Sequence, residues 1–240
     1  APKAWVINYT NPMSLCVKTL YHVFPEIKAF GCCHEVFGTQ KLLAQIAERE
    51  LGLTNIARED IVVNVLGLNH FTWFDRASYK GIDLFPVYRH FIETHFEEGF
   101  EEKDNNWMNS TFACAHRVKF DLFQKYGWIA AAGDRHLAEF MPPIYLKDPQ
   151  TVASWKFGLT TVTWRKEDLK KRLEKSKRLV SGEEQVELNP SGEEGILLIK
   201  ALCGLTRVIS NVNIPNTAGQ IPNLPKSAVV ETNAVFSRDS

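Results

Sequence analysis

The chain opens with an apolar run that ends at an Asn-Pro pair, and this run constrains the fold more than any other feature. Residues 4–10 read Ala-Trp-Val-Ile-Asn-Tyr-Thr and precede Asn11-Pro12. Such strand-forming residues are typical of a buried strand in a parallel sheet, and Asn-Pro indicates the turn that ends it. A parallel strand needs neighbours that are supplied by βα units. No Gly-x-Gly-x-x-Gly or Gly-x-x-x-x-Gly-Lys motif is present in the sequence to mark a first unit.

We therefore expect a fragment, truncated at both ends, of a protein whose nucleotide-binding half comes first. Residues 1–30 are predicted to end that nucleotide-binding domain, and residues 31–240 to form a catalytic domain that binds substrate and metal. The alternative is an edge strand in a complete domain. Helices predicted over residues 37–51, 84–96 and 166–180 interleave with strands over 61–66, 208–214 and 228–235. They do not alternate strictly, which favours an α+β fold.

Composition excludes some classes of function. The 28 basic and 28 acidic side chains give a formal net charge of zero, which argues against a nucleic-acid partner. No apolar run approaches the roughly 18 residues that a membrane span needs. Five cysteines, an odd number that includes the adjacent Cys32 and Cys33, fit a reduced cytoplasmic protein better than a disulfide framework.

The densest group of reactive side chains is Gly-Cys-Cys-His-Glu at residues 31–35, where a predicted strand meets a predicted helix. A thiol there would lie near the positive end of the helix dipole, which favours the thiolate. Thiolate and imidazole are both good ligands for a divalent transition metal. The alternative is structural, with a buried Cys and a capping His. No Cys-x-x-Cys pair is present, which argues against a structural zinc site.

A second group, Gly-Leu-Asn-His at residues 67–70, follows a predicted strand. In parallel and mixed sheets, ligand-binding residues lie at the carboxyl ends of strands. Asn69 offers a donor and an acceptor, and His70 offers one lone pair. An ordinary turn with a half-buried His is the alternative.

A third group, Gly-Asp-Arg-His-Leu-Ala-Glu-Phe at residues 133–140, follows an apolar stretch. Asp134 is predicted to be a helix N-cap, and capping alone could explain it. Four ionisable side chains beside apolar residues also indicate a partly buried site where pKa values are shifted.

Taken in order, these groups resemble glycoside hydrolase family 4, together with a late segment, Gly-Gln-Ile-Pro-Asn-Leu-Pro at 219–225, and the pair Val230-Glu231. The resemblance spans nearly all of the chain. It implies an α+β catalytic domain similar to the carboxyl-terminal domain of lactate and malate dehydrogenases, preceded by the last strand of a doubly wound α/β sheet. This family is an NAD-dependent exception to glycoside hydrolysis by two carboxylates.

The resemblance also implies a mechanism. NAD⁺ takes hydride from C3 of the sugar, and a divalent metal, usually Mn²⁺, binds the C2 and C3 oxygens. A base then removes the C2 proton, the C1 substituent departs with acid help, water adds, and NADH returns the hydride. By motif, Cys33 and His70 are the metal ligands and His34 is the acid. Asn11 is expected to contact substrate near the nicotinamide, and Asn69 to be a second substrate contact.

The sequence departs from the family at two points. Members that act on 6-phospho sugars carry Cys-Asp or Cys-Asn where this chain has Cys33-His34, and they use a Tyr base that has no match here. Asp134 is therefore predicted to be the base, with His136, also a predicted substrate contact, as its rival. The Cys-His form resembles members that cleave non-phosphorylated α-galactosides, α-glucosides or α-uronides. Residues 133–140 favour the uronide branch, where Arg135 or Arg117 would pair with a C6 carboxylate.

The predicted function is hydrolysis of α-glycosides, above all α-galacturonides, by a homo-oligomer, a dimer or tetramer. The expected partner is a small carbohydrate substrate, and neither a membrane nor a nucleic acid is expected to be a partner. Two other functions stay open. An NAD-dependent 2-hydroxy-acid dehydrogenase shares the fold but needs no metal, which would leave Cys33 and His70 without a role. An inert fragment is the other alternative. The identities of the sugar and of the metal are open as well.

Overall fold

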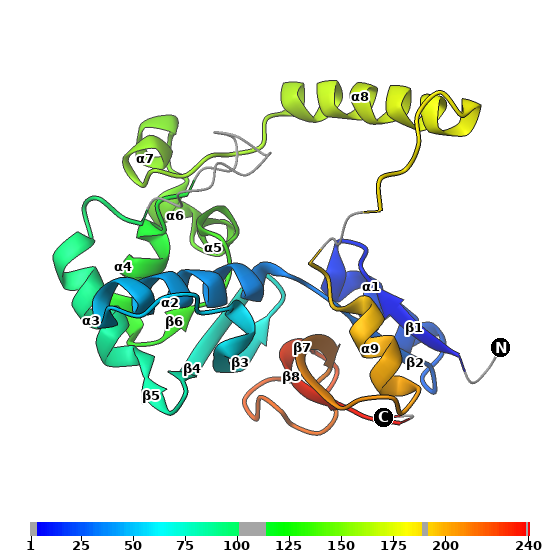
Figure 1. Ribbon diagram of the computed structural model, residues 1–240, viewed down its shortest axis with the longest axis horizontal. Coiled ribbons are helices and arrows are strands. Elements are labelled where there is room, and N and C mark those ends of the chain that lie inside the picture. Colours follow the sequence, from blue (N-terminus) through cyan, green and yellow to red (C-terminus); the bar gives the residue numbers. More distant parts are fainter. Residues whose placement is uncertain (1–3, 101–113, 189–191, 239) are drawn as a thin grey trace.

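The computed structural model describes residues 4–100, 114–188, 192–238 and 240, which form two sheets with helices around them (Figure 1). The first sheet has the strand order β1-β2-β7-β8. It consists of β1 (Trp5–Asn8), β2 (Lys28–Gly31), β7 (Val208–Pro215) and β8 (Val229–Phe236). β1 and β2 are parallel and are connected through α1 (Met13–Val23), whereas β7 and β8 add antiparallel strands. The opening run is therefore a strand of a parallel pair, as predicted.

The core of this first sheet lies against α9 (Gly195–Leu202). Phe30 on β2, Leu198 on α9 and Phe236 on β8 are all buried in it. Residues near both ends of the chain thus build one sheet. The predicted domain boundary between residues 30 and 31 falls within β2, and the division into domains stays a prediction.

The second sheet is antiparallel. Its strands are β3 (Ile61–Leu68), β4 (Phe71–Tyr79), β5 (Ile82–Asp83) and β6 (Ile129–Ala130), with β6 beside β4. The 3₁₀ helix η1 (Arg58–Asp60) precedes β3. The helices α2 (Glu35–Leu51), α3 (Leu84–His95) and α4 (Arg117–Tyr126) share a core with this sheet. On α2, the buried Leu42, Leu43, Ile46 and Ala47 have the helical spacing that the sequence predicted, and Gly52 ends the helix in the left-handed conformation.

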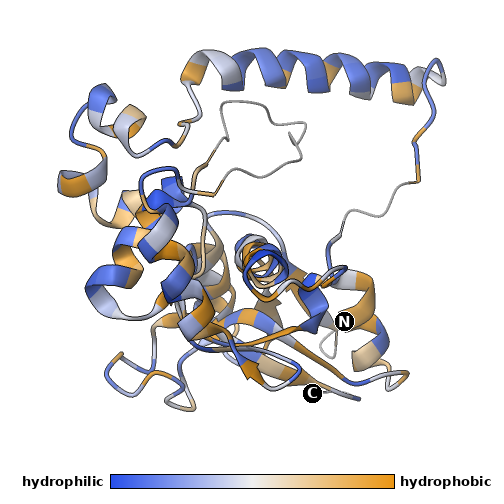
Figure 2. Cartoon of the chain, turned by 60° about the vertical axis from the view of Figure 1, so that its left-hand side comes forward, coloured by the Kyte–Doolittle hydropathy of each residue, from blue (hydrophilic) through white to orange (hydrophobic). Residues whose placement is uncertain are grey.

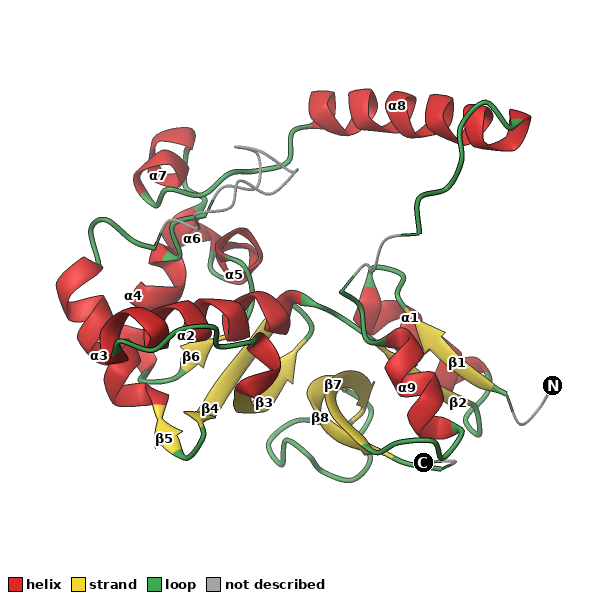
Figure 3. Ribbon diagram, in the orientation of Figure 1, coloured by secondary structure: helices red, strands yellow, loops and turns green. Residues whose placement is uncertain are grey.

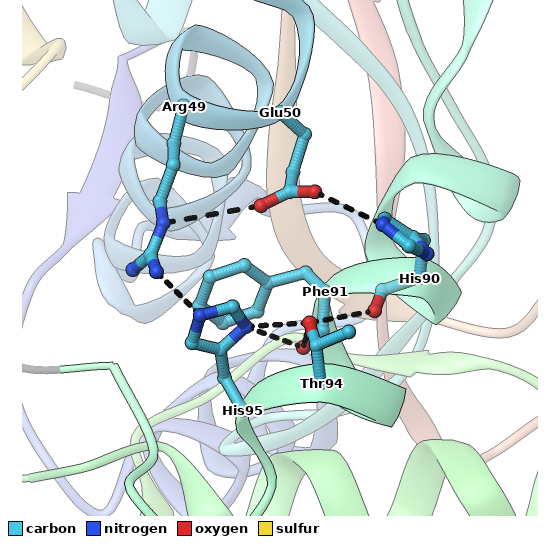
Figure 4. A network of polar contacts seen from close by, with 6 residues as sticks. All are labelled: Arg49, Glu50, His90, Phe91, Thr94 and His95. Atoms are coloured by element: carbon cyan, nitrogen blue, oxygen red, sulfur yellow. Dashed lines mark hydrogen bonds and ion pairs between the residues drawn. The ribbon is translucent and has the colours of Figure 1, made fainter.

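A network of polar contacts also joins the carboxyl-terminal ends of α2 and α3 (Figure 4). His90 Nε2 lies 3.6 Å from Glu50 Oε2, and Arg49 approaches both Glu50 and the ring of His95. Glu35 begins the same helix roughly 20 Å away, at 1.5 Å per residue. The network therefore fastens the two helices at the end of α2 that lies far from Glu35.

The remaining helices are α5 (Asp134–Phe140), α6 (Pro142–Tyr145), α7 (Pro149–Ser154) and α8 (Val162–Ser181). None of the α8 side chains is buried, and the helix lies apart from both sheets (Figures 2 and 3). Its sequence is highly charged, which is typical of a helix on the surface. None of the described helices combines the length and the apolar composition that crossing a membrane requires. Helices and strands thus interleave without strict alternation, and the predicted α+β fold is confirmed.

The two sheets meet where β3 passes β8. The side-chain oxygen of Asn233 on β8 accepts a hydrogen bond from the backbone N–H of Val65 on β3, at 2.5 Å. This junction brings the turn between β3 and β4, with Asn69 and His70, close to β8 and to the amino end of α2, where Cys33 and His34 lie.

Candidate active site

Side chains from four parts of the chain gather at the amino end of α2. They come from the β2–α2 connection, from the turn between β3 and β4, from α5 and from β8. Contacts and electrostatic interactions link them to one another. The members of this site are Cys33, Glu35, Asn69, His70, Arg135, His136 and Glu231. Glu35 and Glu231 were not predicted as site residues, and the others were.

Two histidine rings form the centre of the site. His70 adopts the left-handed conformation, with φ of 64°, and its ring stacks on that of His136 with centroids 4.0 Å apart. Burial lowers the pKa of His70 to about 4, and the neighbouring His136 adds to this effect. His70 is therefore neutral at neutral pH, with a lone pair to offer to a metal.

Glu35, the first residue of α2, links this helix to the start of α5. Its Oε2 accepts a hydrogen bond from the backbone N–H of Gly133 at 2.9 Å, and its Oε1 lies 3.5 Å from His136 Nε2. Burial alone would raise the pKa of Glu35, but the hydrogen bond and charge of His136 hold it well below its usual range. An ionised carboxylate thus orients the His136 ring and lies close enough to influence the pKa values of both His70 and Cys33.

Cys33 lies in the same site as a protonated thiol. Burial raises its pKa to about 12, and the charge of Glu231 adds to the rise. The backbone N–H of Glu35 and the side chain of Asn69 both donate to the sulfur and lower the pKa. The helix amino terminus therefore acts in the predicted direction, but burial outweighs it. The prediction from the helix dipole has the right direction but did not include the larger effect of burial.

Glu231, on β8, accepts hydrogen bonds from two asparagine side chains. Its Oε2 accepts from Asn69 Nδ2 at 3.1 Å, and its Oε1 accepts from Asn211 Nδ2 at 2.7 Å. Burial raises the pKa of Glu231 to about 7, although these hydrogen bonds oppose the rise. Asn211 also donates to the carbonyl oxygen of Cys33 at 3.1 Å, so β7 and β8 fasten both the cysteine and the turn that carries Asn69.

Two further predicted residues lie at exposed positions. His34 occupies the N-cap position of α2, and its Nδ1 lies 2.8 Å from Glu193 Oε1. This pairing leaves Nε2 of an exposed ring available for proton transfer. Asn11 lies between β1 and α1, where its side-chain oxygen accepts a hydrogen bond from the backbone N–H of Met13 at 3.2 Å. Glu193 was not predicted, and only the fold brings it to His34.

Asp134 has a different position from the one predicted. It is the first residue of α5, and its N-cap is Gly133, so the prediction that Asp134 caps its own helix is wrong. Its fully buried carboxylate accepts hydrogen bonds from the backbone N–H groups of Val118 and Lys119, at 3.1 and 3.2 Å. Asp134 therefore caps α4 across space. Nothing in this geometry supports its predicted role as the base, which stays a prediction.

Replacing Asp134 with Ala is expected to destabilise the protein by about 1–3 kcal/mol, because two buried N–H groups lose their acceptor. Asp134→Asn keeps one acceptor oxygen and should recover part of this loss. Thermal melting of the two variants measures the effect. If Asp134 is instead the base, Asp134→Asn will melt near the parent protein and still lose activity.

The two candidate arginines differ in their surroundings. Arg117 donates to the carbonyl oxygens of Phe96 and Ser154, at 3.0 and 2.5 Å, and to Glu97 at 2.6 Å. Arg135 is half-buried on α5, next to His136 and near Glu35. Since three protein oxygens already occupy the guanidinium of Arg117, Arg135 is the better candidate for a carboxylate ligand.

Among the described residues, one further group could hold a metal ion by its spacing. It consists of Cys114, His116 and Asp134, whose ligand atoms lie within 4.8 Å of one another. The Asp134 oxygens already cap α4, which makes this group a part of the protein interior rather than of the site around His70. The Cys-x-His spacing was the only sequence signal for it.

Comparison with protein families shows which family the chain belongs to. The model of the family 4 glycosyl hydrolase C-terminal domain matches residues 65–240, and that of family 4 glycosyl hydrolase matches residues 1–49. The chain belongs to glycosyl hydrolase family 4. The family 4 assignment confirms the predicted resemblance and, with it, the class of fold.

Individual family 4 proteins are similar over the whole chain. An alpha-galacturonidase from Lachnoclostridium phytofermentans is 77% identical over 241 residues, which cover 100% of this chain and 52% of that protein. A crystal structure of lplD from Bacillus subtilis matches with a TM-score of 0.92 at 54% identity, over 100% of this chain and 54% of that one. A 6-phospho-alpha-glucosidase from gut microorganisms, in complex with NAD and Mn²⁺, shares the fold at 19% identity, with a TM-score of 0.68 over 100% of this chain and 52% of that one. The chain therefore spans about half the length of its relatives.

Proposed function

We propose that this chain is the carboxyl-terminal part of a longer protein, called the full-length protein below, that hydrolyses α-galacturonides with NAD and a divalent metal. The observation that carries the proposal is the 77% identity, over the entire chain, to an alpha-galacturonidase. The site around His70 supports it, because residues from four parts of the chain converge on a pair of stacked imidazoles.

Cys33 and His70 are proposed to hold the metal, and the donor set fits this role. His70 is neutral, with a pKa of about 4, and a thiol with a pKa of about 12 loses its proton when it coordinates a cation. When bound, Mn²⁺ would act as a Lewis acid on sugar oxygens, and NAD would accept the hydride. Two protein ligands leave room for oxygen atoms of the substrate.

Proton transfers are assigned to histidines paired with carboxylates. His34 is proposed as the acid, since Glu193 at 2.8 Å orients its ring. His136 is proposed as the base that removes the C2 proton, because Glu35 orients it in the same way. Arg135, on the same helix as His136, is proposed to pair with the C6 carboxylate, and Asn11 and Asn69 are proposed to contact the sugar.

Activity of the full-length protein on nitrophenyl α-glycosides and α-uronides tests the proposal. With NAD⁺ and Mn²⁺, the α-galacturonide should be the best substrate, chelation should stop cleavage, and Mn²⁺ should restore it. Metal-independent oxidation of a 2-hydroxy acid would favour the dehydrogenase instead. The 240-residue chain alone, assayed in parallel, should cleave nothing if the nucleotide-binding half is needed.

Replacing Arg135 with Lys is expected to reduce kcat/KM for the α-galacturonide at least about tenfold more than for the neutral α-galactoside. Lys keeps the charge but loses the two-pronged pairing with a carboxylate. Steady-state kinetics on both substrates measure the difference. Arg172→Lys on α8, where the arginine is exposed and pairs with Asp168, serves as a control. Equal losses on both substrates would remove the argument for a uronide.

A further inference from the structure

A buried carboxylate with no role in the proposed reaction lies against the turn that carries Asn69. Glu231 is 1% exposed, and within the described residues no Lys, Arg or His forms an ion pair with it. Its two oxygens accept from different side-chain amides, Oε1 from Asn211 and Oε2 from Asn69. Because both of its oxygens accept from amide N–H groups, this carboxyl group constrains the orientation of each amide that it contacts.

The side chain of Asn69 has two orientations of nearly equal shape, related by a half-turn that exchanges Oδ1 and Nδ2. Against the carboxylate of Glu231 only one of them is favourable, because the other brings two acceptors together. The side chain of Asn69 also lies close enough to Cys33 to lower the pKa of this thiol. With Nδ2 directed at Glu231, Oδ1 is on the other branch of the amide and is the atom left for a ligand.

We propose that Glu231 is a positioning residue that fixes the amide of Asn69, so that Oδ1 accepts a hydrogen bond from a hydroxyl of the sugar. This inference rests on the proposed function, since the ligand is the galacturonide. The site then favours a sugar that carries a hydrogen-bond donor where it faces Oδ1 of Asn69. A hydroxyl donates to Oδ1, whereas a deoxy or fluoro substituent leaves that oxygen unpaired.

The surroundings of Asn211 explain why a change at Glu231 would act on Asn69. Asn211 is 5% exposed, and its Nδ2 donates to the carbonyl oxygen of Cys33 as well as to Glu231. A backbone carbonyl and a buried position hold this amide in place. In Glu231→Gln, the new amide oxygen would therefore accept from Asn211, and its NH₂ group would face residue 69. The side-chain amide of Asn69 would then flip and direct its NH₂ group, instead of Oδ1, to the sugar.

A reciprocal exchange in the full-length protein tests the inference. Glu231→Gln should raise KM for nitrophenyl α-galacturonide, and the Kd for galacturonate, about tenfold. Asn69→Asp places two carboxylates next to each other and should raise both the KM and the Kd at least as much. In the double variant, the amide at 231 donates to the carboxylate at 69, and the other carboxylate oxygen accepts from the sugar. The double variant should therefore recover most of the affinity, while Glu174→Gln on exposed α8 should leave it unchanged.

Steady-state kinetics, calorimetry with galacturonate and thermal melting are measured on all five proteins. Losses in affinity that simply multiply in the double variant would overturn the inference, even if the parent protein is fully active. If the parent protein neither cleaves an α-galacturonide nor binds galacturonate, the proposed function fails. The thermal midpoints then still decide whether residues 69 and 231 are paired, and additive midpoints would overturn the inference in that case as well.

Discussion

Replacing Cys33 or His70 with Ala in the full-length protein is expected to abolish Mn²⁺ binding and to reduce α-galacturonide hydrolysis by about a thousandfold. A bound metal contributes several kcal/mol of transition-state stabilisation, and each 1.36 kcal/mol corresponds to a tenfold change in rate. Each variant removes one of the two protein ligands proposed. Titration with Mn²⁺ followed by electron paramagnetic resonance measures the binding, and nitrophenol release measures the activity.

Controls for this prediction come from the same chain. Cys203 is exposed and His22 lies in the last turn of α1, so Cys203→Ala and His22→Ala should bind Mn²⁺ as the parent protein does. Cys114→Ala tests the other metal-ligating group that spacing suggests. If Cys114→Ala loses Mn²⁺ while Cys33→Ala retains it, the metal belongs in the group around Asp134 and the present proposal is wrong.

Much of the fold could be predicted because its signals are local. The apolar spacing on α2 and the β-branched run of β3 depend on neighbours in sequence, and both elements are where the pattern placed them. The turn at Asn69 and His70 follows from its position after a strand. These residues approach Cys33 because β3, β8 and the start of α2 meet at the junction of the two sheets, which no local pattern specifies.

The partners of the site residues were missed for the same reason. Glu35, Glu193 and Glu231 each contact a site residue that lies far along the chain, and a carboxylate in sequence carries no sign of its acceptor role. Asp134 shows the converse error. Gly133-Asp134 has the local form of an N-cap, yet the carboxylate caps α4, because the packing of α5 on α4 points it toward the unpaired N–H groups there.

Replacing Gly67 with Ala is expected to cost about 3 kcal/mol of stability and to weaken Mn²⁺ binding together with it. Gly67 has φ of 142°, a conformation that residues with a side chain rarely adopt, and it lies opposite Thr72 in the β3–β4 ladder. An added Cβ would lie 2.4 Å from the carbonyl oxygen of Phe71 and 2.9 Å from the Cα of Thr72. Both are backbone atoms of β4, so the hairpin itself must move to relieve the contact.

The turn that would move carries Asn69 and His70, which is why stability and metal affinity should fall together. Gly81, in the turn at the other end of β4, provides a matched control. Its φ of 86° is also left-handed, but a Cβ there would meet nothing within 4 Å. Gly81→Ala should therefore cost only about 1 kcal/mol from backbone strain and leave Mn²⁺ binding intact. Thermal melting and Mn²⁺ titration of both variants distinguish the backbone strain that both substitutions cause from displacement of the turn that carries Asn69 and His70. Equal effects in both would show that the close approach of β4 to Gly67 does not position His70.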